Sequence, residues 1–521
     1  MGRSASILGA LALGLFLTGG AWVLASSLLA SPDDDYHLAS VWCASTAPDA
    51  GCRDQSEAPE VGSRHALVPE PIGPGGVCFA FQATVSAACA PAETQPPVLT
   101  LGRIDTGRYP STYYEFMGLF ARSEVSESVL IMRMVAWTIS ASLLVAAAAV
   151  SAPDLRRAFA FGVLATCVPM GVFLFASNNP SGPTVAGTAA YWCATTAFLQ
   201  GGVSRRRRSA QGAVAVAAAI TALGSRYDAG LWIMAASIGA VLATGTWYRM
   251  PWRRLLVPAV ASVAGFAFAL SSGRVGQALR GIGPGSQEAL GTTVFQNLLA
   301  LPSLLTGPLG TAYLGWHDTP VPSLTSTLTI GVVVVLLFVG MSRRSRDKSL
   351  AMGAIAAAVA VAPMYTLAVN GTPVGVGLQP RYLLPLLPIA VATALLRPRS
   401  GTPVGLTRGQ AVAIGSALAV AHSAALHEVI RRYVTGVDVR GFDLGADLEW
   451  WWAQGPSPMA VWVLGSLGFA SVVATVLALT GSLDLSIGRR PAAVVTATTT
   501  PPTVLVPVGT DEVDEVAELP G

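Results

Sequence analysis

The chain has 521 residues, of which 52% are hydrophobic and only 12% charged. Soluble domains carry roughly a quarter of charged residues, so this composition excludes water as the solvent for most of the chain. The formal net charge of +3 is small and the arginines are spread along the chain, which excludes nucleic acid as a partner. We therefore expect membrane lipid as the main surroundings.

Apolar stretches of about 20 residues, the length that crosses a bilayer, recur from the first residues to about Thr480. Basic clusters separate them, and the positive-inside rule predicts that each cluster lies in a cytoplasmic turn. The clusters are Arg156-Arg157, Arg205 to Arg208, Arg249 with Arg253-Arg254, Arg343 to Lys348, Arg397 to Arg408, and Arg489-Arg490. This pattern predicts an all-α polytopic membrane protein of about twelve transmembrane helices with both termini in the cytoplasm, and Phe295–Leu314 has the alternative of a re-entrant segment.

The predicted boundaries follow the composition along the chain. A first transmembrane helix is expected over residues 1–30, an extracytoplasmic loop subdomain over 31–127, and the remaining transmembrane bundle over 128–486. Residues 487–521 are rich in Thr, Pro and Val and then acidic, which predicts a disordered cytoplasmic tail. A cleaved secretory signal is the alternative for the first segment, although its apolar run is longer than the usual core of roughly 7–15 residues.

Cysteines gather in the first predicted loop. Cys43, Cys52, Cys78 and Cys89 all lie there, outside the membrane, where disulfides can form. The short separations favour the pairs Cys43–Cys52 and Cys78–Cys89. A zinc site is the alternative, but the spacing lacks a pair of cysteines two residues apart. We expect a small subdomain closed by two disulfides.

An acidic motif follows the first span directly, with the sequence Ser31-Pro32-Asp33-Asp34-Asp35-Tyr36-His37. Pro32 is expected to begin a short helix that places Asp33 and His37 one turn apart on one face. Adjacent carboxylates repel one another, which raises at least one pKa unless a cation is near, and either outcome suits a general base or a metal ligand. The alternative is a solvated acidic helix start that the helix dipole favours.

Further polar and aromatic residues recur where spans are predicted to end on the outer side. They are Arg133, Asn178 to Ser181, Ser225 to Asp228, Trp316 to Pro320, Gln379 to Tyr382, Arg431 to Tyr433, and Trp450 to Trp452. Outer arginines run against the topological bias, and a lipid phosphate or pyrophosphate would explain them because a guanidinium binds phosphate well. The alternative is an interfacial aromatic belt in which Arg226 merely pairs with Asp228.

Several of these motifs, in this order, resemble those of the domain of unknown function 2142 family. They are Ser31-Pro32-Asp33-Asp34 with His37, Tyr113-Tyr114, Asn179-Pro180-Ser181, Ser225-Arg226 with Asp228, Gly315-Trp316 with Asp318-Thr319-Pro320, and Arg381-Tyr382-Leu383-Leu384-Pro385. The resemblance covers about Ser31–Tyr433 and implies a multi-pass protein of a bacterial envelope. Its layout is similar to that of glycosyltransferases of the C superfamily (GT-C), which use polyprenyl-phosphate sugars and keep an acidic motif in the first outer loop.

The resemblance implies sugar transfer from a polyprenyl-phosphate donor to an envelope glycan, lipid or protein acceptor. Asp33 or Asp34 would deprotonate the acceptor hydroxyl, while Arg226, Arg381 and Arg431 would stabilise the leaving phosphate. The candidate substrate-binding residues are His37, Tyr113, Tyr114, Asn179, Arg226, Asp228, His317, Asp318, Gln379, Arg381, Tyr382 and Arg431.

The sequence departs from the family pattern at Asp34, where Glu is frequent, at Asp35, where Pro is frequent, and at His317, where an apolar residue is common. These changes leave open which acid acts, and whether Asp33, Asp34 and His37 hold a divalent metal such as Mg²⁺ or Mn²⁺. Two other function classes also stay open. One is a transporter or flippase of a lipid-linked envelope component, and the other is a non-catalytic scaffold that binds an envelope protein through its loop subdomain.

Overall fold

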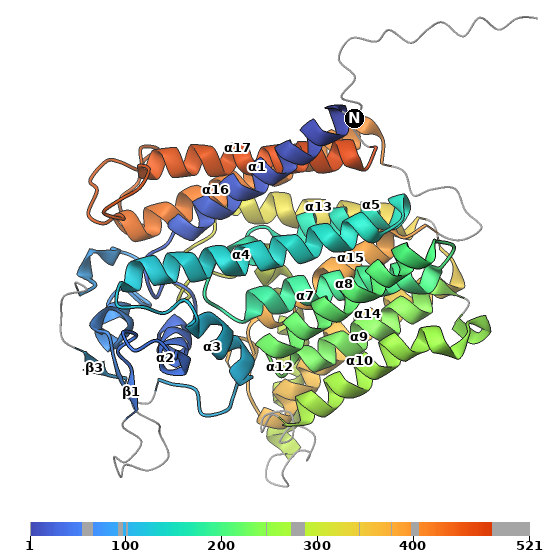
Figure 1. Cartoon of the computed structure of the whole chain (residues 1–521), viewed down its shortest axis with the longest axis horizontal. Helices are drawn as coiled ribbons and strands as arrows, with labels where there is room; N and C mark the ends of the chain where they lie inside the picture. The colour runs from blue at the N-terminus through green and yellow to red at the C-terminus, as the bar shows by residue number, and fades with distance from the viewer. Residues whose placement is uncertain are drawn as a thin grey trace, which may run out of the picture. The chain divides into compact units, whose positions relative to one another are not determined.

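The computed structural model describes residues 2–54, 66–91, 97–100, 103–245, 247–271, 287–342, 344–376, 378–397 and 406–481. Its elements are almost all helices (Figure 1). The tail that the sequence predicts at 487–521 lies outside the described residues.

Seven of the described helices are long and apolar enough to cross a bilayer. They are α1 (Gly2–Leu24), α4 (Val125–Val150), α10 (Trp252–Ser271), α13 (Ser323–Met341), α14 (Arg346–Asn370), α16 (Arg408–Val434) and α17 (Pro458–Leu479). Helices that are shorter or less apolar complete the bundle: α5 (Pro153–Cys167), α6 (Met170–Phe175), α7 (Ser181–Gln200), α8 (Arg205–Ser225), α9 (Ala229–Thr244), α12 (Gln287–Thr306) and α15 (Leu387–Leu395). The chain is thus a multi-pass, mostly helical membrane protein, as the sequence predicts.

Hydroxyl residues begin several of these helices. Ser204, Ser345 and Ser457 each accept a hydrogen bond from the backbone N–H three residues ahead, at the starts of α8, α14 and α17. Thr407 does the same for α16 and forms a reciprocal capping box with Gln410. These caps satisfy N–H groups that have no partner within the helix, and they fix where each helix begins after its turn.

Helix α7 lies at the centre of the bundle, between α4, α8 and α9 (Figure 1). Every residue from Ser181 to Ala197 is buried, and most are Gly, Ala, Ser or Thr. Small side chains let neighbouring backbones approach closely: a Cβ atom on Gly187 would lie 2.7 Å from the carbonyl oxygen of Ala218 in α8. Because α7 faces protein rather than lipid, it is less apolar than the lipid-facing spans.

One end of the bundle carries α2 (Asp34–Ala44), α3 (Ser111–Gly118) and a small antiparallel sheet, while the start of α1 and the end of α17 lie at the opposite end (Figure 1). The sheet runs in the order β1 (Arg53–Asp54), β2 (Ala66–Val68), β3 (Val98–Leu99), with Leu67 opposite Leu99. Disulfides join Cys43 to Cys52 and Cys78 to Cys89, the pairing that the short separations favour.

The basic turns meet at the end opposite this subdomain. Arg207 donates hydrogen bonds to the carbonyls of Val150 and Ser151, which end α4. Arg157 donates to the carbonyl of Leu406, and Arg397 pairs with Asp154 at 3.4 Å. Clusters that are far apart in sequence therefore share one end of the bundle, as a common side of the membrane requires.

Candidate functional site

The segment that joins α1 to α2 is buried, yet it is not helical, so its carbonyl groups need partners from elsewhere. Arg133, fully buried in α4, donates to the carbonyls of Val23, Ser26 and Ser27 at 3.1, 2.7 and 2.6 Å. Burying a charged side chain inside a membrane span costs free energy, and these three hydrogen bonds offset that cost for Arg133.

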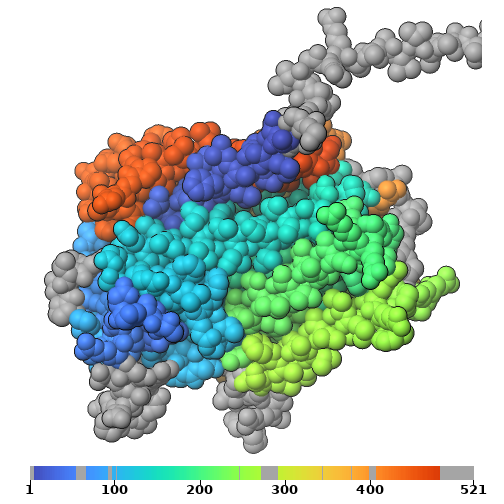
Figure 2. Space-filling model, viewed as in Figure 1, coloured from blue at the N-terminus to red at the C-terminus, as the bar shows by residue number. Residues whose placement is uncertain are grey.

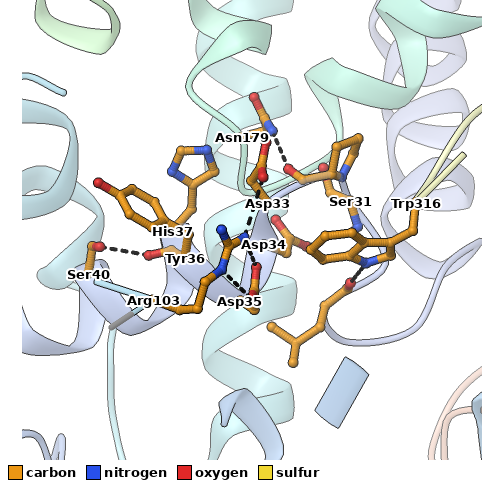
Figure 3. Close-up of polar contacts among 12 residues, drawn as sticks. Ser31, Asp33, Asp34, Asp35, Tyr36, His37, Ser40, Arg103, Asn179 and Trp316 are labelled. Atoms are coloured by element: carbon orange, nitrogen blue, oxygen red, sulfur yellow. Dashed lines mark hydrogen bonds and ion pairs between the residues drawn. The ribbon is translucent and has the colours of Figure 1, made fainter. Parts of the chain in front are cut away.

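Four more side chains hold the same segment, each from a different part of the chain. Figure 3 shows two of these bonds, from Trp316 Nε1 to the carbonyl of Leu29 at 2.7 Å and from Asn179 Nδ2 to that of Pro32 at 2.8 Å. The others run from Trp452 to the carbonyl of Leu24 and from Tyr433 to that of Ala30. The whole bundle therefore fixes the position of the acidic motif that follows.

Asp33 precedes α2 with a left-handed backbone, φ 61° and ψ 19°. Its carboxylate accepts a hydrogen bond from Arg381 Nη2 at 2.9 Å and a longer one from Arg103 at 3.4 Å, while 37% of the side chain stays exposed. Burial pushes the pKa of Asp33 up, but Arg381 and Arg103 outweigh it and hold the pKa below the ordinary value. Asp33 is therefore an accessible, ionised carboxylate.

Of the other two acids of the motif, Asp35 shares Arg103 with Asp33, whereas Asp34 points into the core (Figure 3). Asp34 is completely buried, accepts the backbone N–H of Ser31 at 3.2 Å, and lies 4.0 Å from Arg133. Burial raises the pKa of Asp34 to about 7 although Arg133 opposes the shift. Asp35 accepts two hydrogen bonds of 2.7 Å from Arg103. The neighbouring arginines offset much of the mutual repulsion of the carboxylates, although Asp35 and Asp33 still act to raise the pKa of Asp34.

His37 lies one turn after Asp33, as its spacing predicts, with its N–H donating to the Asp33 carbonyl at 2.9 Å. Its ring is buried, with Nδ1 3.0 Å from the hydroxyl of Tyr114 and the ring of Tyr109 at 4.9 Å. Burial lowers the pKa of His37 to about 3 despite Asp33, so the ring is neutral at neutral pH. His37 thus positions Tyr114.

The predicted metal set is not assembled. Asp34 points into the core, and the described residues contain no group of three or more His, Cys, Asp or Glu that could hold an ion. Asp33, Asp34 and His37 therefore do not form a joint ligand set in this geometry.

Arg226 lies between aromatic rings beside this cluster. It binds Asp228 through two hydrogen bonds of 2.8 Å and donates to Ser181 Oγ at 3.2 Å. Its guanidinium also lies 4.7 Å from the ring centre of Tyr382, and that of Arg381 lies 5.1 Å from the same ring. Both arginines therefore contact the ring of Tyr382, and this shared cation–π contact holds two positive charges near Asp33.

A small pocket of 20 Å³ lies next to Asp33. Its wall includes Pro32, His317, Gln379 and Arg381, together with α6 residues such as Phe173. His317 has a left-handed backbone, φ 59°, at the turn that follows Trp316. Three of the predicted ligand-binding residues thus come together here from distant parts of the sequence.

A model of the DUF2142 family, described as a predicted membrane protein, matches residues 16–390. The chain belongs to the DUF2142 family. The matched region runs from α1 into α15 and includes Asp33, Arg226, His317 and Arg381. No match was found among curated proteins or among solved structures.

Three residues predicted from the DUF2142 resemblance lie apart from the Asp33 pocket. Asp318 pairs with Arg432 at 2.8 Å, with both side chains buried. Arg431 lies beyond the matched region and donates to the carbonyls of Gly441 and Asp443, in the loop before α17. Tyr113 is buried beside Asp34. These contacts give the three residues roles in holding loops and core together.

Arg103 contacts Asp33, and Tyr109 contacts Arg226. Both residues therefore belong to the site, although the sequence did not predict them as site residues. Arg103 lies in a polar loop where an arginine is unremarkable, so no local pattern separates it from a solvated charge. Arg103 nevertheless helps Arg381 to hold the pKa of Asp33 low in this DUF2142 protein.

Proposed function

We propose that this DUF2142 protein is an integral-membrane glycosyltransferase that moves a sugar from a polyprenyl-phosphate donor to a cell-envelope acceptor on the extracytoplasmic side. One observation carries the proposal: an accessible carboxylate, Asp33, is held 2.9 Å from Arg381, and Arg381 lines a small pocket together with His317 and Gln379. Such a site offers a base for the acceptor and a cation for the phosphate of the donor.

The proposed topology has twelve spans in a GT-C-like arrangement. We assign them to α1, α4, α5 with α6, α7, α8, α9, α10, α13, α14, α15 with the turns from Pro380, α16 and α17, and treat α12 as a re-entrant helix. The shared end of the basic turns and the disulfides of the opposite subdomain support cytoplasmic termini and an extracytoplasmic site.

In the proposed reaction, Asp33 takes the proton of an acceptor hydroxyl. The acceptor oxygen forms a bond to the anomeric carbon, and the bond from that carbon to the phosphate oxygen breaks with its electron pair moving to the phosphate. Arg381 and Arg226 are placed to stabilise that charge, since both lie against Tyr382.

Donor binding would also activate the base. Arg381 holds the pKa of Asp33 low in the free protein. A phosphate that engages Arg381 cancels part of its positive charge, which raises the pKa of Asp33 and makes the carboxylate a better proton acceptor. The pairing of base and arginine therefore couples binding to catalysis.

The test is transfer of radiolabelled sugar from a panel of polyprenyl-phosphate sugars to envelope extract by the purified, reconstituted protein. The matched variants are Asp33→Asn and Asp35→Asn, since both acids bind Arg103 but only Asp33 contacts Arg381. We expect transfer that Asp33→Asn abolishes and Asp35→Asn retains. Absence of transfer from every donor, or equal loss in both variants, would contradict the proposal.

A further inference from the structure

A groove of about 340 Å³, separate from the Asp33 pocket, lies between the α1–α17 pair and the α4–α5 pair. Its walls are almost entirely aliphatic or aromatic, and Arg156 is the one charged residue among those that line it. Representative lining residues are Leu8, Leu15, Val145, Phe159 and Val472. Figure 2 shows α1 packed along α17 on this side of the molecule.

The groove arises because α1 and α4 touch near one end and separate toward the other. They meet where Trp137 of α4 packs on Gly19 of α1 and donates to the carbonyl of Leu15 at 3.1 Å. Beyond that contact, the groove runs back along α1 from Thr18 to Leu8. Ten residues of helix span about 15 Å, half of the roughly 30 Å hydrocarbon core.

The charge at the mouth indicates which lipid fits. Arg156 lies where α4 ends and donates to the carbonyls of Ala148 and Ser151. Arg207 donates to the same Ser151 carbonyl, so two guanidinium groups meet at this end of the groove. Water is excluded from such an apolar recess in a bilayer, and a phosphate beside these arginines would neutralise their charge.

We propose that this groove binds one acyl chain of an anionic phospholipid from the leaflet at the basic end, with the lipid phosphate at Arg156. The groove ends against Val172 and Phe175 of α6, while Phe173 and Leu174 on the same helix line the Asp33 pocket. Helix α6 thus separates the two cavities. The site is independent of the proposed sugar transfer, and the bound acyl chain fills the space between the α1–α17 pair and the α4–α5 pair.

The test uses spin-labelled phosphatidylglycerol and phosphatidylcholine in vesicles that contain the full-length protein, with electron paramagnetic resonance to count motionally restricted lipid. We expect about fivefold preference for phosphatidylglycerol, the effect of one basic residue at a lipid phosphate. Arg156→Gln should abolish that preference.

Groove-filling variants provide a second readout that does not depend on Arg156, whose loss also removes the cap of α4. Ala141 and Ala160 line the groove, so Ala141→Phe and Ala160→Phe would fill it. The control Ala217→Phe adds the same bulk on an exposed face of α8. We expect the first two to remove the restricted phosphatidylglycerol and the third to retain it. An unchanged signal in the filled variants would overturn the site, and displacement by polyprenyl phosphate in preference to phosphatidylglycerol would overturn the proposed occupant.

Discussion

Arg133 provides the sharpest test of how the acidic motif is held. Arg133→Met keeps an apolar stem in α4 but removes the donors to Val23, Ser26 and Ser27, and it leaves Asp34 without its cation. Removing one partner of a buried ion pair costs about 3–5 kcal/mol of stability. Each buried carbonyl that loses its hydrogen bond costs about 1–3 kcal/mol more, and these costs sum to less than their arithmetic total. We expect a loss of at least about 4 kcal/mol in stability.

The assay is thermal unfolding of the detergent-solubilised protein, with Arg122→Met as the control because Arg122 is exposed just before α4. The double variant Arg133→Met with Asp34→Asn completes a cycle, and we expect a coupling energy of about 1–3 kcal/mol between the two side chains. A melting temperature of Arg133→Met equal to those of Arg122→Met and the wild type would refute the reasoning.

Three further predictions concern the site and its supports. Arg381→Gln should weaken donor binding and, because it removes the cation that lowers the pKa of Asp33, shift the acid limb of the pH–rate profile upward; an unmoved limb would contradict the coupling. The pKa of buried Asp34 rises from 3.8 to about 7, so the folded state binds its proton more tightly, and stability should fall by about 4 kcal/mol as pH rises from about 4 to 7. Asp34→Asn should abolish that fall in melting temperature, and a fall that persists in this variant would exclude Asp34 as its cause. Arg432→Met removes the hydrogen bonds to the carbonyls of Phe79 and Val85, so we expect limited proteolysis to cleave the Cys78–Cys89 loop faster than in the wild type. Equal cleavage rates would show that Arg432 does not anchor this loop.

The sequence predicted the helical membrane class, the DUF2142 family and the cysteine pairs because these depend on composition and local spacing. It also predicted the one-turn relation of Asp33 and His37, which follows from helix geometry. Of its outer arginines, Arg226 and Arg381 lie near Asp33, while Arg431 binds a loop elsewhere.

Other features depend on contacts that no local pattern encodes. Asp33 and Asp34 are adjacent and of the same residue type, yet Asp33 is accessible and Asp34 is buried. The side chain of Asp33 points toward Arg381, and that of Asp34 points toward Arg133. Arg133 itself carried a signal, because a charge within a span requires a partner, but the sequence could not name the carbonyls of α1. Helix α7 contains four threonines because protein rather than lipid surrounds it.

The most direct test of the proposed function measures sugar transfer and donor binding in parallel for Asp33→Asn. Loss of a general base typically slows a reaction by about 100- to 10,000-fold, while Arg381 and Arg226 remain to bind the phosphate of the donor. We predict a fall in transfer rate of at least about 100-fold with donor affinity retained. Transfer within about tenfold of wild type would contradict a base at Asp33, and loss of donor binding in proportion to transfer would assign Asp33 to the binding site rather than to catalysis.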